Sequence, residues 1–348
     1  MQRLIFLLLL CAACRTTPPP PDTSRIDYRG ETMGTTYSVI YFDSLGRNFQ
    51  PEMDSLLLAI NAEVSTYEEN SFISRWNRSD AGYQTKTPLA ETHPHFTVNL
   101  ENAFDTHART DGQFDPTIMP LVNLWGFGYT QKRLDAVADS VNIDSLRMLV
   151  GLTERVQYHP GQFLIKTLPG VQLDFSANAK GYAVDELGRL LERALVTDYF
   201  VEIGGEVRAR GQKPDGSAWT IGINVPREDA ALNEVQTIVE LRGRGNTNSV
   251  ATSGNYRNYY DVAGERVSHI INPKTGYPER RTLLSASVFA ENCMVADAYA
   301  TAFMVMGTEA AFDFATQQPE LEAYLIFADE ANEMKFIYTE GLAEVFRE

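Results

Sequence analysis

The stretch YFVEIGGEVRARG, residues 199–211, contains two strand-like runs separated by a pair of glycines. Similar runs bounded by turn residues follow it: WTIGINVP at 219–226, VQTIVELRG at 235–243 and SHIINPKTG at 268–276. Strands that come in runs, with only a few helices between them, favour an α+β fold over regular βαβ alternation. We therefore predict largely antiparallel sheets with packed helices, and the last of these runs places His269 on a strand.

Helical spacing of apolar residues predicts the elements that cover these strands. The segment that follows Asn178 has a core-facing stripe of Val184, Leu187, Leu191 and Leu195. Residues 53–64 and 97–110 have the same periodicity, and the apolar run 292–307 is the last long helix that we expect. The sequence QFDPTIMPLVNLWGFG at 113–128 has two prolines and two glycines, so it predicts a loop-rich segment with a functional role.

Composition limits the classes of protein to which the chain can belong. With 348 residues, 44% of them hydrophobic, it can form one large domain or two closely joined lobes. The net charge of −16 argues against a nucleic-acid partner, because phosphate binding requires a basic surface. The sequence contains no P-loop, HExxH or paired CxxC motif, which disfavours a zinc hydrolase or a Rossmann dehydrogenase.

The N-terminus predicts export and lipidation. An apolar run ends in small residues before Cys14, and at roughly ten residues it has the length of a signal-peptide core rather than of a membrane span. We predict a lipoprotein signal peptide at 1–13, a lipidated Cys14 with a Pro-rich tether at 14–27, and a folded domain at 28–348. Plain secretion with an incidental Cys14 is the alternative. In the folded domain Cys293 is expected to be a buried structural thiol.

The apolar helix at 292–307 contains an unexpected polar pair. Asp297 and Thr301 are four residues apart, so their side chains lie on one face, one turn apart. A carboxylate and a hydroxyl are hard oxygen ligands of the kind that Mg²⁺ or Ca²⁺ prefers, and the alternating alanines of this helix would let another segment approach closely. The alternative is a purely local role, in which Asp297 caps the helix and Thr301 bonds back to a helix carbonyl.

Two further segments carry candidate site residues. In LDFSANAKGYAVD, Asp174 ends an expected strand and a helix begins near Ser176, where free amides and the adjacent Lys180 could bind a phosphate. An ordinary N-cap by Ser176 is the alternative. In the polar and aromatic segment 249–278, His269 is a candidate general base, although a lone His on an apolar strand is more often a satisfied core residue.

Together these motifs resemble one family. The strings ETMGTTYSV, STYEENSFISRWN, GQFDPTIMPLVNLWGFG, LDFSANAKGYAVDELGRLL, VEIGGEVRARG, SVATSGNY, SHIINPKTGYP and VADAYATAFMVMG occur in the order of the ApbE-type flavin transferases, over roughly residues 28–340. The resemblance implies an ApbE-like, T-fold-related single domain of two closely joined lobes with a central FAD cleft. It also implies Mg²⁺-dependent transfer of FMN from FAD to a Thr or Ser hydroxyl of a target protein, with release of AMP.

The resemblance also assigns roles to individual positions. Asp297, Thr301 and the Ala177 carbonyl would be metal ligands, and His269 would be the catalytic base that activates the acceptor hydroxyl. The residues that would contact FAD are Met33, Ser71, Phe114, Asp115, Asp174, Lys180 and Ile271. The family usually has Asp where this chain has Asn255, which bears on the choice of acceptor more than on the chemistry.

The resemblance implies partners and a location as well. The acceptor would be a redox-pump subunit or an FMN-binding domain, and the lipid on Cys14 would anchor the protein to a bacterial membrane facing the periplasm. Three alternatives remain open: an FAD pyrophosphatase that uses water as the nucleophile, a non-catalytic FAD-binding lipoprotein, and self-flavinylation at Thr252.

Overall fold

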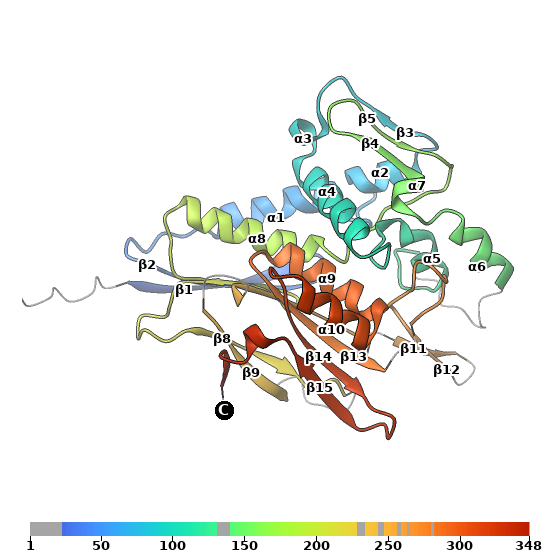
Figure 1. Cartoon of the computed structure of the whole chain (residues 1–348). Coiled ribbons are helices and arrows are strands. Elements are labelled where there is room, and N and C mark those ends of the chain that lie inside the picture. Colours follow the sequence, from blue (N-terminus) through green and yellow to red (C-terminus); the bar gives the residue numbers. More distant parts are fainter. Residues whose placement is uncertain are drawn as a thin grey trace, which may run out of the picture.

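The computed structural model describes residues 23–130, 140–227, 234–242, 247–255, 259–262, 265–279 and 282–347 (Figure 1). The helices are α1 Gln50–Val64, α2 Phe72–Arg78, α3 Leu89–Thr92, α4 Pro94–Arg109, α5 Met119–Leu124, α6 Ser140–Arg147, α7 Leu152–Arg155, α8 Ala179–Arg193, α9 Cys293–Met306 and α10 Thr308–Gln317, with 3₁₀ turns η1 Pro116–Ile118 and η3 Glu340–Leu342. The strands are β1 Ser24–Thr32, β2 Thr35–Asp43, β3 Gly82–Gln84, β4 Val156–His159, β5 Phe163–Lys166, β6 Tyr199–Ile203, β7 Glu206–Arg210, β8 Trp219–Asn224, β9 Val235–Leu241, β10 Ser249–Gly254, β11 Tyr259–Val262, β12 Glu265–Ser268, β13 Leu283–Ala290, β14 Glu322–Ala328, β15 Met334–Tyr338 and β16 Phe346–Arg347.

An eight-stranded sheet in the order β1-β2-β6-β7-β10-β13-β14-β15 forms the centre of the molecule. Its neighbouring strands all pair antiparallel, which confirms the predicted α+β class. Successive side chains of a strand point to opposite faces, so Val39 of β2 lies under the helices while Ile40 contacts the core on the other face. The stretch 199–211 is the central hairpin β6–β7.

Helices cover one face of this sheet, and a small sheet covers the other (Figure 1). Helix α8 packs on β6 and shares one core with α1, α4 and β2, whereas α9 and α10 pack on β13 and β14. The sheet β16-β9-β8 shares a separate core with the opposite face. Of the predicted stripe on α8, Val184, Leu187 and Leu191 are buried, but Leu195 is 85% exposed. The prediction for Leu195 was wrong because the helix ends at Arg193 and the chain then turns, with φ +63° at Leu195.

A second lobe contains α2–α7 and the small sheet β3-β5-β4. The segment that leads from this lobe to α8 forms no β-ladder, so the strand predicted to end at Asp174 was wrong. The side-chain carbonyl of Asn77 accepts a hydrogen bond from the Leu173 amide, and the Pro116 carbonyl accepts one from the Asp174 amide. Side-chain and loop acceptors thus satisfy this backbone where a neighbouring strand would otherwise do so.

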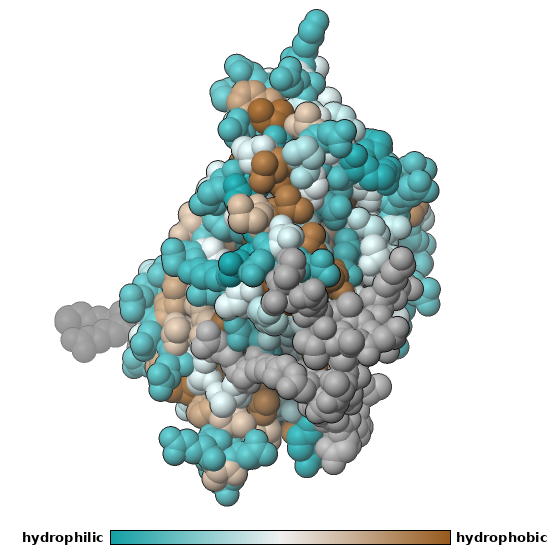
Figure 2. Space-filling model, turned by 90° about the vertical axis from the view of Figure 1, so that its right-hand side faces the viewer, coloured by the Kyte–Doolittle hydropathy of each residue, from teal (hydrophilic) through white to brown (hydrophobic). Residues whose placement is uncertain are grey.

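The hairpin β11–β12 and the loop after it form an arm beside α5 and α6. His269 is the first residue after β12, so its predicted position within a strand was wrong by one residue. Among the residues coloured in Figure 2, the face turned toward the viewer is mostly hydrophilic, with hydrophobic side chains in separate patches. Within the described ranges, no helix combines the length and apolarity needed to cross a bilayer.

Candidate active site

A cavity of about 620 Å³ lies where the two lobes meet, a volume typical of small-molecule sites. Its walls come from α8, α9, the β6–β7 turn, β8, β10, the loop before η1 and the arm that follows β12. The predicted site residues on its lining are Phe114, Asp115, Asp174, Ala177, Lys180, His269, Ile271, Asp297 and Thr301. The fold therefore brings together candidates that lie more than half of the chain apart.

The carboxylate of Asp297 lies against the first turn of α8. Its Oδ2 accepts a hydrogen bond of 3.0 Å from the Gly181 amide, and its Oδ1 lies 4.0 Å from the Lys180 ammonium. Asp297 is only 3% exposed, and burial raises the pKa of its carboxyl group, which Lys180 partly offsets. The local capping role considered for Asp297 is not observed, since its partner is on another helix.

Lys180 has a second carboxylate partner, Glu206 at the start of β7. The Nζ of Lys180 lies 2.6 Å from Glu206 Oε1. Burial alone would lower the pKa of Lys180, but the charges of Asp297 and Glu206 raise it above its ordinary value. Burial raises the pKa of Glu206 to about 7, with Lys180 acting in the opposite direction. Lys180 is the sole Lys or Arg on the described lining of the cavity.

The hydroxyl of Thr301 lies one turn beyond Asp297, on the same side of α9. Its Oγ1 is 3.2 Å from the Oγ of Ser253 on β10, and both residues line the cavity. No described hydrogen bond joins Thr301 to a carbonyl of its own helix, so the local alternative is not supported. Asp297 and Thr301 thus both line the cavity, with Asp297 also bonded to the facing helix α8.

Asp174 organises the turn that leads into α8. Its Oδ1 accepts hydrogen bonds from the Ser176 amide at 2.9 Å and the Ser176 hydroxyl at 2.6 Å. The N-cap position of α8 is occupied by Asn178, which makes no side-chain capping bond, so the alternative with Ser176 as N-cap was wrong. Ser176 and Ala177 instead form part of the cavity wall next to Lys180.

Asp115 shapes the cavity through its own hydrogen bonds. It caps η1 by accepting from the amide and hydroxyl of Thr117, and its Oδ2 accepts from the Leu152 amide. The His107 ring nitrogen lies 3.5 Å away. Burial raises the pKa of Asp115, and the hydrogen bonds from Thr117 and Leu152 and the charge of His107 lower it in part. Since the carboxylate is committed to these partners, its contribution is to hold the loop on which Phe114 meets the cavity.

Comparison with known proteins adds an independent finding. The model of the ApbE family matches residues 33–325. An FAD:protein FMN transferase from Vibrio cholerae serotype O1 is 38% identical over 289 residues, covering 82% of each chain.

This chain belongs to the ApbE family.

Solved structures of the ApbE family agree with the fold described above. The flavin transferase ApbE from Vibrio cholerae has a TM-score of 0.80 at 33% identity, over 93% of this chain and 99% of that chain. The apo form of Pseudomonas stutzeri flavinyl transferase ApbE gives 0.80 at 33% identity, over 93% and 97%. The similarity therefore extends over nearly all of the described structure.

Two positions assigned from the ApbE resemblance do not reach the described cavity lining. Ser71 is buried and caps α2 by accepting from the Ser74 amide, while its hydroxyl donates to the Ser65 carbonyl. Met33 occupies the β1–β2 turn with φ +50° and packs against the helical core. Their contact with FAD remains a prediction. Cys14 lies outside the described residues.

The structure also shows site residues that the sequence reading missed. Glu206 lies directly after the Gly204–Gly205 turn, in a stretch read only as a strand pair, and its Oε2 is buried with no hydrogen-bond partner among the described residues. Tyr67 lines the cavity from the loop before α2 and donates to the Phe127 carbonyl. The sequence did carry a signal for each residue. Glu206 is an acidic residue directly after a glycine turn, and Tyr67 is an aromatic residue within a motif of the family.

The donors at this ApbE site suit a hard divalent cation. Asp297, Thr301 and the Ala177 carbonyl would supply oxygen ligands, and the nearby Oε2 of Glu206 is buried with no hydrogen-bond partner among the described residues. The described residues contain no group of three or more His, Cys, Asp and Glu side chains suited to a metal. The proposed set needs no such group, because a hydroxyl, a carbonyl and substrate phosphates would supply the other oxygens.

Proposed function

We propose that the chain is an FAD:protein FMN transferase that uses Mg²⁺. The observation that carries the proposal is the meeting of Lys180, Asp297 and Thr301 on one wall of a cavity of about 620 Å³, in a chain of the ApbE family. The name of the Vibrio cholerae relative gives the reaction, and the size and polar lining of the cavity suit a dinucleotide.

Asp297, Thr301 and the Ala177 carbonyl would hold Mg²⁺. The bound cation would neutralise charge on the pyrophosphate oxygens as a Lewis acid. Lys180 supplies the other local positive charge, which an acidic protein needs in order to bind a dinucleotide anion. Glu206 orients the Lys180 ammonium and keeps it protonated.

His269 is the proposed general base. Its ring lies on the cavity lining, 6.2 Å from the ring of Phe127 between centroids. The hydroxyl oxygen of the acceptor forms a bond to the FMN phosphorus, and the hydroxyl proton passes to His269. The P–O bond to AMP breaks, and AMP leaves with the electron pair. A positioned base contributes roughly 10²–10⁴-fold to such a step, because a neutral hydroxyl is a poor nucleophile.

The Asp297→Ala variant tests this assignment. We expect it to lose Mg²⁺-dependent FMN transfer by about 100-fold or more, since charge stabilisation in the transition state is lost. The measurement is the mass of a candidate acceptor domain after incubation with enzyme, FAD and Mg²⁺. Asp313→Asn on α10 is the control, because Asp313 is exposed and does not line the cavity.

Each alternative activity predicts a different result in the same assay. Release of FMN and AMP without any mass gain on an acceptor would indicate hydrolysis by water. Tight FAD binding without turnover would indicate a flavin-binding protein, and full activity of Asp297→Ala would contradict the metal site. FMN mass on the enzyme itself, lost in Thr252→Ala, would indicate self-flavinylation.

The proposed location is a bacterial membrane, facing the periplasm, with the lipid on Cys14 as the anchor. The apolar leader that ends at Cys14 and the Pro-rich tether after it support this proposal. The acceptor is then a protein exposed in the same compartment, such as a redox-pump subunit or an FMN-binding domain. Replacing Cys14 by Ser should move the protein from the membrane fraction to the soluble fraction.

A further inference from the structure

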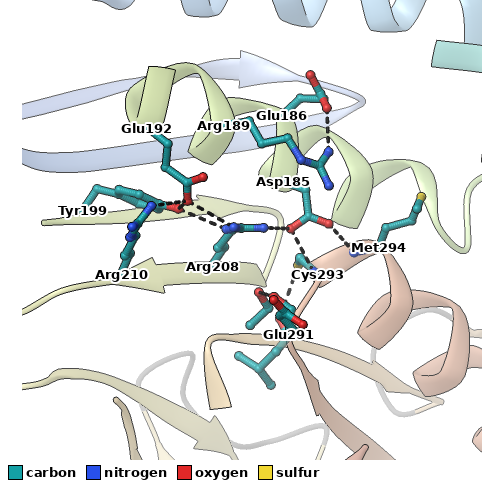
Figure 3. Close-up of polar contacts among 12 residues, drawn as sticks. Asp185, Glu186, Arg189, Glu192, Tyr199, Arg208, Arg210, Glu291, Cys293 and Met294 are labelled. Carbon is teal, nitrogen blue, oxygen red and sulfur yellow. Dashed lines mark hydrogen bonds and ion pairs between the residues drawn. The ribbon is translucent and has the colours of Figure 1, made fainter. Parts of the chain in front are cut away.

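The carboxylate of Asp185 lies at the centre of a polar network between α8 and α9 (Figure 3). Asp185 is 0% exposed, and its Oδ1 accepts a hydrogen bond of 2.8 Å from Nη1 of Arg208. The same carboxylate accepts from the backbone amides of Cys293 and Met294, each at 3.0 Å. Cys293 and Met294 are the first residues of α9, so a side chain of α8 satisfies amides that a helix start leaves free.

Helix α9 depends on this external cap because its own N-terminus lacks one. The N-cap residue Asn292 makes no side-chain capping bond, and the first turn of α9 contains no acidic residue. Asp297 and Thr301 follow on the same helix, within three turns of the capped end. A contact that fixes the start of α9 therefore also fixes where the proposed metal ligands lie along the helix axis and which way they point around it.

A second contact between the helices lies one turn away from Asp185. The Gly181 amide donates to Oδ2 of Asp297 at 3.0 Å. Gly181 also permits the close approach, since a Cβ there would lie 2.4 Å from the Cys293 carbonyl oxygen. Gly181 and Asp185 are four residues apart, so they lie on the same face of α8. The contacts of Gly181 and Asp185 with α9 therefore fix both the position and the rotation of α9 relative to α8.

Arg208 holds the Asp185 carboxylate in place from the sheet side. Its Nε donates to the Tyr199 hydroxyl at 3.0 Å, and its Nη2 donates to Glu192 at 3.1 Å. Arg208 lies on β7, two residues after Glu206, the partner of Lys180. One strand therefore supports both Lys180 and the cap of α9.

We propose that Asp185, held by Arg208, is a positioning residue that places Asp297 and Thr301 for a divalent cation. It does not touch the cation or the substrate and acts through the start of α9. The inference rests on the cation site of the proposed function but not on the identity of the nucleophile.

The test is cation binding by the full chain without FAD. Free Mn²⁺ is followed by electron paramagnetic resonance during titration of wild type, Asp185→Asn and Glu192→Gln. We expect Asp185→Asn to weaken Mn²⁺ binding by about 10–100-fold, the usual effect of losing an outer-shell partner. Glu192→Gln is the matched control, because it removes an Arg208 contact on the side away from α9. It should lower the unfolding temperature but change Mn²⁺ affinity by less than about twofold, the scale of a weakened, partly buried ion pair, because Asp185 keeps its bonds to Arg208 and α9.

A kinetic readout and a rescue variant separate positioning from simple stability. At saturating Mg²⁺, Asp185→Asn should keep a near-normal kcat while its Mg²⁺ requirement rises. Adding Asn292→Asp should restore a local cap and the unfolding temperature. It should not restore Mn²⁺ affinity, because the contact between the Asp185 carboxylate and the start of α9 is still missing. If Asp185→Asn alone does not fold, Mn²⁺ binding is measured on the double variant instead.

Two results would overturn the inference. The first is unchanged Mn²⁺ affinity in a folded Asp185→Asn protein. The second is an equal loss of affinity in Glu192→Gln, or its full recovery in the double variant, which would make the role of Asp185 one of general stability. If the wild type itself binds no Mn²⁺, the cation site of the proposed function fails as well, and that outcome is distinct from the first two.

Discussion

At the scale of single residues, the site contains one cation between two buried carboxylates. When all three groups are ionised, Lys180 balances only one of Glu206 and Asp297, which are 4% and 3% exposed. A buried charge without compensation is costly, so this cluster is most stable with a further positive group beside it. The electrostatics of this cluster therefore favour a cation at the place where the proposed oxygen ligands meet.

Lys166 leads to a prediction about pH. Its Nζ donates to the carbonyls of Asn77 and Ser79 and lies 4.4 Å from the centroid of the Trp76 ring. Burial lowers the pKa of Lys166 from 10.5 to about 8. Between these values the unfolded chain binds more protons than the folded chain, so stability rises with pH. From pH 7 to 9.5, we expect the unfolding free energy of wild type to rise by about 2 kcal/mol relative to Lys166→Met.

Urea unfolding at several pH values measures this difference. The control is Lys86→Met, because Lys86 is exposed, and its stability should follow the wild-type pH profile. Identical pH profiles for wild type and Lys166→Met would show that Lys166 titrates normally in the folded state.

At the scale of elements, α9 is a helix packed on both sides. Ala298 and Ala302 lie in the core shared with α1, α4 and α8, whereas Ala296 and Ala300 lie in the core shared with β13 and β14. Small side chains on both sides let α9 fit between a helix and a sheet. The closest approach comes from Gly181 on α8, which the sequence reading did not single out.

Gly181→Ala tests how close this packing must be. Because the new Cβ would meet the Cys293 carbonyl oxygen, α8 and α9 must separate. We expect a loss of about 1–3 kcal/mol of unfolding free energy, typical of overpacking, together with weaker cation binding. Chemical denaturation and Mn²⁺ titration measure the two effects. In Gly161→Ala the Cβ meets no atom within 4 Å, so that variant should show neither.

At the scale of the whole molecule, the arm that carries His269 lies outside the large sheet and is held by a separate core. Its buried members are Leu121, Trp125, Ile143, Tyr260, Val267 and Ile271. Two hydrogen bonds join the arm to Trp125, the residue directly after α5: the Tyr260 hydroxyl donates to the Trp125 carbonyl at 2.6 Å, and Trp125 Nε1 donates to the Gly276 carbonyl at 2.9 Å. The position of His269 relative to Asp297 therefore depends on the docking of two lobes.

Tyr260→Phe is expected to loosen this arm. It leaves a buried carbonyl without its donor, which costs about 1–3 kcal/mol. We expect faster amide hydrogen exchange at 265–279 and a lower kcat, with cation affinity unchanged because α8 and α9 are not affected. Tyr277→Phe is the control on the same arm, since Tyr277 is 41% exposed. Equal exchange rates in wild type and Tyr260→Phe would contradict the proposed docking role.

The sequence by itself determined the features that depend on local periodicity. Alternating runs between glycines gave the antiparallel strands, and the four-residue spacing of Asp297 and Thr301 put both on one helical face. These features follow from backbone geometry over a few residues, so neighbouring letters are enough to predict them. Residue order within motifs was likewise enough to indicate the ApbE family.

Only the tertiary structure decided which distant groups meet. Glu206 is a partner of Lys180, and Asp185 is the cap of α9, because β7, α8 and α9 pack together. The exposure of Leu195 depends on where α8 stops, and the capping role of Ser71 depends on a loop. The physical reason is that burial and hydrogen-bond partners are set by contacts between segments far apart in the chain, which no local pattern records.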